Sequence, residues 1–224
     1  MGLGRPARAW LIAYVVVAAA DLAAELAHWS VVSLVAIALA MPMLLGFLLS
    51  ARPRDRLTTL VAIGLVFSWC GDVFGFAILI KIAFFLIAQL CYAGAFWPYR
   101  ARSVLRRSPL LAALYGLAVL VIILVVAPAA GALAPAVIVY AATIGAMAVL
   151  ATGVSRLTTV GAVIFIVSDT IIAVTTFVVP GRLGIETFLI MATYLLAQTL
   201  IVLGVVRAPA PIAVPPPAAP IARG

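Results

Sequence analysis

Charged residues are scarce in this sequence: Asp, Glu, Lys and Arg make up only 9% of its 224 residues, whereas soluble domains carry about 25%. Hydrophobic residues make up 67%, and the mean hydropathy is +1.35. This composition excludes an ordinary soluble protein and indicates that lipid is the solvent. Because one crossing of a bilayer needs about 20 apolar residues, the chain has room for about eight crossings and for no separate soluble domain.

Cysteine and histidine are also nearly absent. The two cysteines, Cys70 and Cys91, lie inside apolar runs without a CxxC spacing, which excludes a disulfide framework. His28 is the only histidine, so a zinc or iron site with several histidines is excluded as well. Asp21 and Glu25 share a helix face with His28, but a single helix rarely completes a metal site. We therefore predict no metal and no cofactor, and keep Asp21, the deepest of the three, as a candidate substrate-binding residue.

Apolar runs bounded by charges, Pro and Gly predict eight membrane-spanning helices. Their ranges are 10–27, 31–50, 57–76, 82–98, 109–127, 132–152, 158–178 and 185–206. Strands are not expected, because an open strand edge finds no partner in lipid and the runs lack the alternation of a closed barrel. The predicted fold class is an all-α, polytopic integral membrane protein. Residues 1–207 would form a single transmembrane domain, and the Pro- and Ala-rich residues 208–224 a disordered tail.

Basic residues fall mostly in alternate joints between these spans, and twelve of the fourteen Lys and Arg would lie on one side of the membrane. Those twelve are Arg5, Arg8, Arg52, Arg54, Arg56, Arg100, Arg102, Arg106, Arg107, Arg156, Arg207 and Arg223. Lys81 and Arg182 would lie on the other side. The positive-inside rule then predicts that both termini are cytoplasmic, in the plasma membrane of a bacterial cell. The net charge of +8 comes from these clusters, which lack interleaved aromatics and so indicate no nucleic-acid partner.

Two of the six acidic residues fall well inside predicted spans. Asp72 lies about 15 residues into the third span and Asp169 about 11 into the seventh, so we expect both between the middle of the membrane and its outer half. An ionisable group at that depth costs several kcal/mol and marks a function by default. Two carboxyl groups in one apolar cavity would leave one protonated and one ionised, an acid and a base. The alternative is that each carboxyl only joins helices, through hydrogen bonds to Ser68 or Ser168.

Other polar side chains inside the spans are candidates for the lining of this cavity. They are Gln89 and Tyr92 on the fourth span, Tyr140 on the sixth, Ser168 on the seventh, and Tyr194 and Gln198 on the eighth. Tyr194 and Gln198 are an i,i+4 pair and therefore share a helix face. Tyrosines often anchor helix ends at the membrane interface, but these three tyrosines lie away from the ends. We predict that all six, together with Asp21, bind the substrate.

Several segments carry a resemblance to a known family. They are Gly71-Asp72 and the runs FFLIAQLCYAGAF, VIVYAATIGAM, GAVIFIVSDTIIAVTTF and ATYLLAQTLIVLG. In this order they resemble the YhhN-like lysoplasmalogenase family, over about residues 57–206. The resemblance implies an eight-helix membrane enzyme that hydrolyses the vinyl ether bond of lysoplasmalogens to a fatty aldehyde and a glycerophospho-alcohol, with Asp72 and Asp169 as key carboxyl groups. The chain carries Met41-Pro42 where the family tends to have Lys-Pro, and Gln89 where it has His.

The implied reaction suits two carboxyl groups. Vinyl ether hydrolysis needs a proton delivered to the alkene carbon, followed by attack of water on the resulting oxocarbenium ion. A neutral carboxylic acid can supply the proton, and a carboxylate can stabilise the cation and activate the water. The reaction needs no cofactor, and a lipid substrate would enter from the bilayer.

Two other functions fit the same residues. A proton-coupled carrier would use Asp72 and Asp169 as a proton relay, and a non-catalytic member of the family would bind lipid without converting it. Interrupted helices at matching places in two halves of the chain would favour the carrier, and the predicted spans show no such interruption.

Overall fold

The computed structural model describes residues 3–180 and 185–209, and helices are the regular elements of both ranges. The long helices are α1 (Arg5–Ala27), α2 (Ser30–Ala51), α3 (Arg56–Phe74), α4 (Ile78–Phe96), α6 (Pro109–Val126), α7 (Ala134–Ala151), α8 (Arg156–Ala173) and α9 (Glu186–Val206). The shorter ones are η1 (Trp97–Arg102), α5 (Val104–Arg107), η2 (Ala127–Leu133) and the π-helical η3 (Val174–Val178). The all-α, polytopic fold that we predicted is confirmed.

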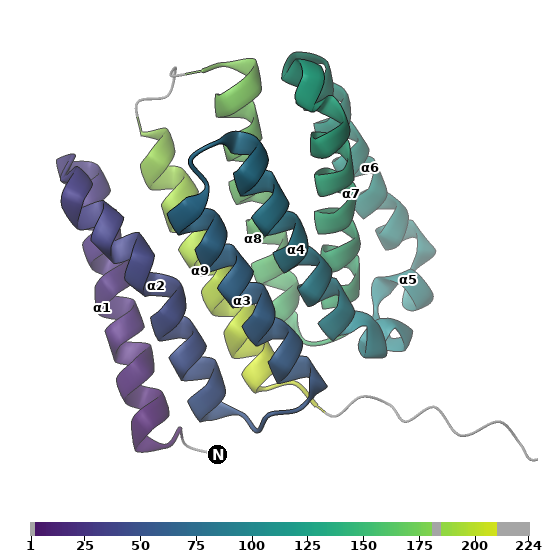
Figure 1. The fold of residues 1–224 in the computed structure, drawn as a ribbon. Helices are drawn as coiled ribbons and strands as arrows, with labels where there is room; N and C mark the ends of the chain where they lie inside the picture. The colour runs from purple at the N-terminus through teal and green to yellow at the C-terminus, as the bar shows by residue number, and fades with distance from the viewer. Residues whose placement is uncertain (1–2, 181–184, 210–224) are drawn as a thin grey trace, which may run out of the picture.

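One apolar stretch of helix holds two crossings. Of the seven stretches that are long and apolar enough to cross a membrane, Pro109–Ala151 has 43 residues, which would make a straight helix about 65 Å long, twice the thickness of the hydrocarbon core. Within η2, Gly131 reverses the chain with a φ of 54°, a left-handed conformation that favours glycine. Helices α6 and α7 therefore pack side by side as a hairpin (Figure 1). The described residues thus contain the eight predicted crossings.

Hairpins of consecutive helices build the bundle. The pairs α1–α2, α3–α4 and α8–α9 make the most extensive contacts, and α7 joins α4 and α8 to α6 at the rim (Figure 1). Helix α9 contacts α1, α2, α3 and α8 and is the most buried of the described crossings. Side chains that α9 directs inward can therefore meet residues from both halves of the chain.

Apolar side chains cover the outside of the bundle, as lipid-facing helices require. Ile12, Val31 and Leu110 are exposed to 64%, 74% and 72%. Several of the largest fully buried side chains are instead tyrosines, including Tyr14 and Tyr92. Because a buried phenol needs a hydrogen-bond partner, the interior must contain a polar network.

Helices α3, α6 and α8 begin at side-chain caps. Asp55, Ser108 and Ser155 each accept a hydrogen bond from a backbone N–H in the first turn of the helix that follows. Burial would raise the pKa of the Asp55 carboxyl, but the Thr58 N–H and the Arg52 guanidinium outweigh burial and lower that pKa below its ordinary value. These caps fix where the three helices enter the bundle.

A proline inside α2 ties this helix to α3. Pro42 has no N–H, so the Ala38 carbonyl one turn earlier lacks its usual helical partner. The indole N–H of Trp69 on α3 donates to this carbonyl at 2.8 Å. Asp72 lies less than one turn beyond Trp69, so this bond also holds the end of α3 that carries Asp72.

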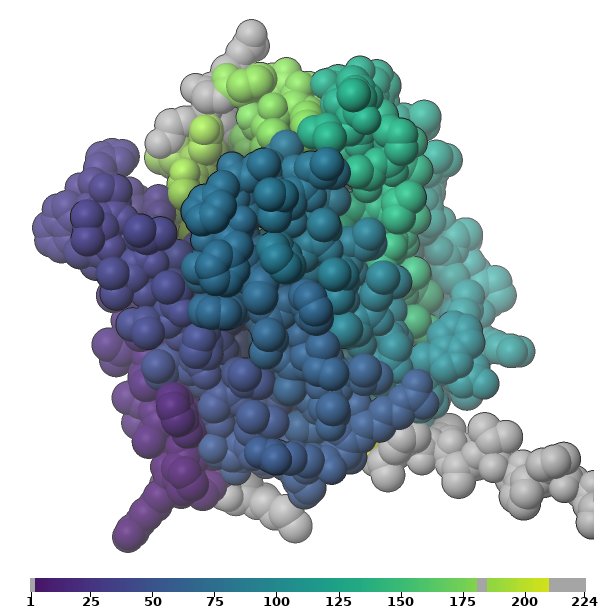
Figure 2. Space-filling model, viewed as in Figure 1, coloured from purple at the N-terminus to yellow at the C-terminus, as the bar shows by residue number. Residues whose placement is uncertain are grey.

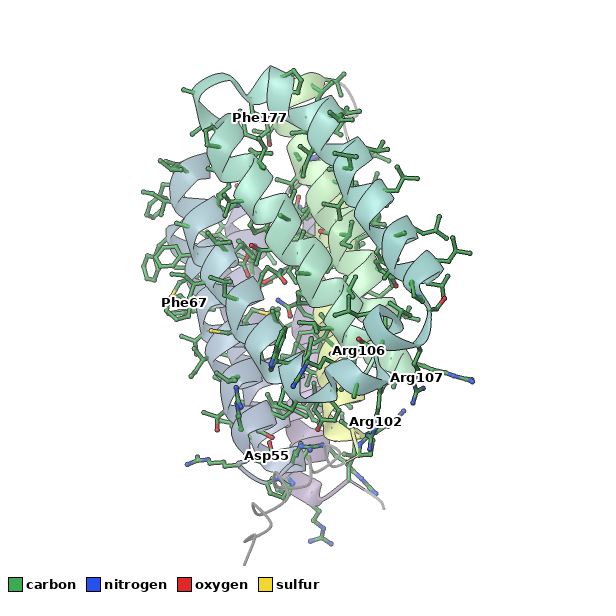
Figure 3. All side chains as sticks on the ribbon, turned by 90° about the vertical axis from the view of Figure 1, so that its right-hand side faces the viewer. Asp55, Phe67, Arg102, Arg106, Arg107 and Phe177 are labelled. Atoms are coloured by element: carbon green, nitrogen blue, oxygen red, sulfur yellow. The ribbon has the colours of Figure 1, made fainter. Side chains whose placement is uncertain are left out.

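The described arginines lie in or beside the start of α1, the α2–α3 joint, η1 and α5, the start of α8 and the end of α9, which all lie at one end of the bundle (Figure 1). Figure 3 shows this end through Asp55, Arg102, Arg106 and Arg107, with Phe177 at the opposite end. Lys81 differs from the prediction, because α4 begins four residues earlier than expected and places it in the first turn of the helix instead of in a joint. Arg182, Arg223 and residues 210–224 of the predicted tail lie outside the described residues.

Cysteines placed at the two ends of the bundle should differ in their reactivity with a maleimide added to intact cells. In a Cys70→Ala, Cys91→Ala background, Phe76→Cys in the exposed α3–α4 joint should react with a membrane-impermeant maleimide in intact cells. Arg106→Cys should react only after the membrane is opened. The reverse pattern would contradict the cytoplasmic assignment of the basic end.

Candidate functional site

One face of α3 meets one face of α9 through polar side chains. Ser68 and Asp72 lie four residues apart on α3, and Tyr194 and Gln198 lie four residues apart on α9. The Tyr194 hydroxyl donates to Oδ2 of Asp72 at 2.8 Å, and Nε2 of Gln198 donates to Oγ of Ser68 at 3.1 Å. On each helix the two bonded residues are about one turn apart. The two hydrogen bonds therefore join α3 to α9 at two successive helical turns.

Tyr92 on α4 extends this network. Its hydroxyl donates to Oε1 of Gln198 at 3.0 Å, and its side chain is fully buried. The ring fits because Gly64, one turn before Ser68 on α3, has no side chain: a Cβ there would lie 2.7 Å from Cδ1 of Tyr92. The sequence analysis missed Gly64, although its spacing of four from Ser68 and eight from Asp72 could have indicated it.

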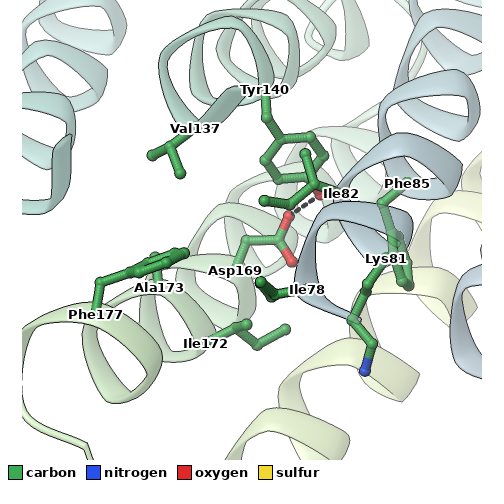
Figure 4. Close-up of a pocket in the computed structure, with 10 residues that line it drawn as sticks. All are labelled: Ile78, Lys81, Ile82, Phe85, Val137, Tyr140, Asp169, Ile172, Ala173 and Phe177. Carbon is green, nitrogen blue, oxygen red and sulfur yellow. Dashed lines mark hydrogen bonds between the residues drawn. The ribbon is translucent and has the colours of Figure 1, made fainter. Parts of the chain in front are cut away.

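Asp169 on α8 belongs to a second polar pair. The hydroxyl of Tyr140 on α7 donates to Oδ2 of Asp169 (Figure 4). Two cavities, of about 60 and 40 Å³, are lined by both residues and otherwise mainly by apolar side chains. Phe177 reaches the larger cavity from the π-helical η3, and π-helical turns often accompany functional sites.

Lys81 is associated with both carboxyl groups. Its positive charge is near enough to act on both Asp72 and Asp169, although among the described residues it forms an ion pair with neither. Its side chain lines the larger Asp169 cavity (Figure 4). The stem of Lys81 packs against Gly75, the residue that ends α3, where a Cβ would lie 2.9 Å from Cε of Lys81. The early start of α4 therefore adds a cation to the site, a role that the sequence analysis did not assign to Lys81.

The two carboxyl groups lie at the same end of the bundle but line different cavities. Asp72 lies two residues before the end of α3, closer to the helix end than we predicted, and lines a cavity of about 410 Å³ that also involves α1 and α2. The two cavities at Asp169 do not include Asp72. Phe85, which lines the larger of them, contacts the ring of Tyr194, with centroids 5.8 Å apart. This ring contact thus joins the lining of the Asp169 cavity to the tyrosine that is bonded to Asp72.

The remaining predicted site residues have different surroundings. Gln89 is fully buried near the Tyr140 hydroxyl, and neither atom of its amide makes a hydrogen bond to a described residue. Ser168 donates to the carbonyl of Ile190 at 3.1 Å and so joins α8 to α9. Asp21 is fully buried on α1, beside the cavity of Asp72. Ser168 therefore has the geometry of a helix-joining residue, whereas Gln89 and Asp21 lie next to the two carboxyl sites.

Comparison with known proteins identifies a family and no individual relative. A sequence model of the YhhN family matches residues 32–205. The match takes in nearly all of α2 to α9 and therefore both carboxyl groups and their tyrosine partners, while α1 lies outside it. No curated protein and no solved structure gives a significant match.

The close fit of Tyr92 against Gly64 predicts that alanine substitutions at two different glycines will have different effects on stability. Gly64→Ala should displace Tyr92 from Gln198 and lower the free energy of unfolding by about 1–3 kcal/mol. Gly116→Ala on α6 is the matched control, because a Cβ there meets nothing within 4 Å, and it should leave stability unchanged or slightly raised. Thermal unfolding of the two variants in the same detergent is the measurement, and equal effects would show that the Gly64 contact does not matter.

Proposed function

The chain belongs to the YhhN family, and we propose that it is a membrane hydrolase that cleaves the vinyl ether bond of lysoplasmalogens with Asp72 and Asp169 as its acid and base. The main support is that two carboxyl groups inside an apolar bundle each accept a hydrogen bond from a tyrosine on another helix. Ionisable groups in such surroundings are rarely kept without a function.

The surroundings of the two carboxyl groups favour different roles. Asp169 lines cavities that are otherwise mainly apolar, where the alkenyl chain of a lysolipid would lie, so we assign it the role of proton donor. Asp72 lines a cavity that also contains Glu25 and Ser33, which suits access of water, so we assign it the role of base. Tyr140 and Tyr194 position the two carboxyl groups through their hydrogen bonds.

The reaction adds one water to an ether of the form R–O–CH=CH–R′. The acid transfers its proton to the alkene carbon that bears R′, which leaves an oxocarbenium ion at the carbon bonded to oxygen. Water attacks this carbon, and the carboxylate accepts a proton from the attacking water. In the resulting hemiacetal, the glycerol oxygen takes up the proton that the base holds, the hydroxyl group gives its proton back to the acid, and the bond between the carbon and the glycerol oxygen breaks. This releases R–OH and the aldehyde R′–CH₂–CHO.

Substrate entry requires movement of apolar side chains. The larger cavity at Asp169 has a volume of about 60 Å³, well below the range of about 300–1,000 Å³ that is usual for ligand pockets. An alkenyl chain must therefore displace residues that line it, and Phe177 on the π-helical η3 is one of those at the end of the bundle. The substrate would reach this region from the bilayer.

Asn substitutions test the proposed pair of carboxyl groups. Asp72→Asn and Asp169→Asn should each reduce turnover of a lysoplasmalogen by about a hundredfold or more, because Asn can neither donate a carboxylic proton nor act as a base. The double variant should be about as slow as either single variant, since the two groups act as a unit. Mass spectrometry of the aldehyde and of the glycerophospho-alcohol measures both products.

A control separates catalysis from helix joining. Each Asn variant should keep the expression level and thermal unfolding of the parent, because the amide can still accept the tyrosine hydrogen bond. If both variants are lost as folded protein, the carboxyl groups join helices, as in the alternative considered above. Folded variants with full activity would rule out the proposed mechanism.

Gln89 next to Tyr140 allows a test by addition of a titrating group. Glutamine keeps one charge state at every pH, whereas histidine changes its charge near neutral pH. Gln89→His should therefore add or move a titration in the pH profile of kcat/KM. The matched control is Leu90→His, because Leu90 lies on the exposed side of α4. Gln198→His would not serve, because Gln198 forms hydrogen bonds with both Ser68 and Tyr92. An unchanged profile at full activity would place Gln89 outside the site.

A further inference from the structure

An apolar groove lies between α6 and α7 at the basic end of the bundle. It has a volume of about 400 Å³, and its lining comes from η1, α5, α6 and α7 and includes Trp97, Leu105 and Tyr115. None of the described residues that line it is charged, and neither Asp72 nor Asp169 is among them. In Figure 2, α5 and α6 project from the right-hand side of the bundle. The volume falls in the range of ligand pockets.

The groove follows α6 and α7 from the basic end toward the middle of the bundle. At its inner end Val119 packs against Gly145, where a Cβ would lie 2.6 Å from Cγ2 of Val119. About one turn nearer the basic end, a Cβ on Gly116 would meet nothing within 4 Å, so the two helices leave room between them there. The lining on α6 runs from Ala112 to Val119, about 10 Å of helix, against about 15 Å for the hydrocarbon of one leaflet. The groove therefore suits an acyl chain from that leaflet.

Arginines lie beside the mouth of this groove. Arg106 and Arg107 directly follow Leu105, which lines the groove from α5. Arg100 lies over the ring of Trp97, 5.0 Å from its centroid. Figure 3 shows the side chains of Arg106 and Arg107 at this end of the bundle. Within the described part of the chain, none of these three arginines forms an ion pair.

Acidic residues are missing from this part of the chain. The sequence has no Asp or Glu between Asp72 and Asp169, so the helices that line the groove contain none. Asp55, in the α2–α3 joint at the same end, is already paired with Arg52 at 3.0 Å. The positive charge at the mouth is therefore open to an anionic group from outside. A phosphate group suits it, because a guanidinium group can bind phosphate through two parallel hydrogen bonds.

A second copy of the chain fits this groove less well than a lipid does. In a two-fold symmetric contact, each copy would bring its own Arg106 and Arg107 toward those of the other copy, and these like charges would repel each other. Basic pockets between transmembrane helices on the cytoplasmic side are instead known to bind anionic lipid headgroups, and the basic end is the one that we predict to be cytoplasmic.

We propose that this groove binds one acyl chain of an anionic glycerophospholipid, such as phosphatidylglycerol, whose phosphate is bound by Arg106 and Arg107. The lipid would come from the leaflet at the basic end. Trp97 is 51% exposed at the mouth of the groove, and indole rings favour the interface between membrane and water. The site is separate from both carboxyl groups, so it does not depend on the proposed function.

Lipid titrations followed by native mass spectrometry of the purified full chain test this site. The probes are phosphatidylglycerol and phosphatidylcholine with the same acyl chains. The parent protein should bind phosphatidylglycerol about twentyfold more tightly, because each of two arginines contributes about fivefold. The double variant Arg106→Gln, Arg107→Gln should lose this preference and keep the parent's affinity for phosphatidylcholine. A parent protein that binds both lipids equally would overturn the proposal, whether or not the variant folds.

The double variant Arg54→Gln, Arg56→Gln is the matched control for charge. It also removes two exposed arginines from the basic end, but these lie in or beside the α2–α3 joint and do not line the groove. It should keep the preference for phosphatidylglycerol. Equal losses in the two double variants would mean that the overall charge of this end attracts the lipid, and would overturn the assignment to Arg106 and Arg107.

Gly116→Leu tests the part of the site that would bind the chain. The added side chain would occupy the groove, and leucine favours a helix more than glycine does, so the variant should fold. It should weaken binding of both lipids by about tenfold, since about two methylene groups of the lipid would lose their place in the groove. Leu117→Phe, on the exposed side of α6, is the control and should bind as the parent does. Unchanged binding by Gly116→Leu would overturn the groove as the binding site.

Discussion

A carboxyl group among apolar helices must find a hydrogen-bond donor, and in this bundle each of the two carboxyl groups finds a tyrosine on another helix. Asp72 on α3 is bonded by Tyr194 on α9, and Asp169 on α8 is bonded by Tyr140 on α7. These bonds require α3 to lie against α9 and α7 against α8. Since α8 and α9 form a hairpin, the two requirements together fix the positions of four crossings that are far apart in the sequence.

The crossings themselves could be predicted from the sequence, because length and hydropathy decide them in lipid. The structure differs from the predicted spans mainly where a helix begins or ends at another residue than expected. The main example is the early start of α4, which brings Lys81 into the site. The apolar residues Ile78, Leu79 and Ile80 that precede Lys81 could have indicated this early start. The seventh predicted span, 158–178, ends where the π-helical η3 ends.

The site could be predicted only in part. The cost of burying a charge identified Asp72 and Asp169, and helical spacing identified Tyr194 with Gln198. Spacing within one helix does not reveal which helices face each other, and the separate cavities of the two carboxyl groups were therefore not foreseen. Gly64 was missed for the same reason, since its role lies in contact with Tyr92 on another helix. Met41, at the place where a lysine was expected by resemblance, is a core residue with 1% exposure.

The separation of the cavities suggests a division between a polar and an apolar half of the site, with the bond to be cleaved between them. The central claim is that the proposed acid protonates the alkene carbon of a vinyl ether. Hydrolysis of a lysoplasmalogen in D₂O tests this directly, with the aldehyde trapped at once and analysed by mass spectrometry. The account predicts one deuterium on the carbon next to the aldehyde carbon, formed by the parent protein and not by Asp169→Asn. Release of an aldehyde without deuterium at this carbon, or no aldehyde from folded protein, would contradict it.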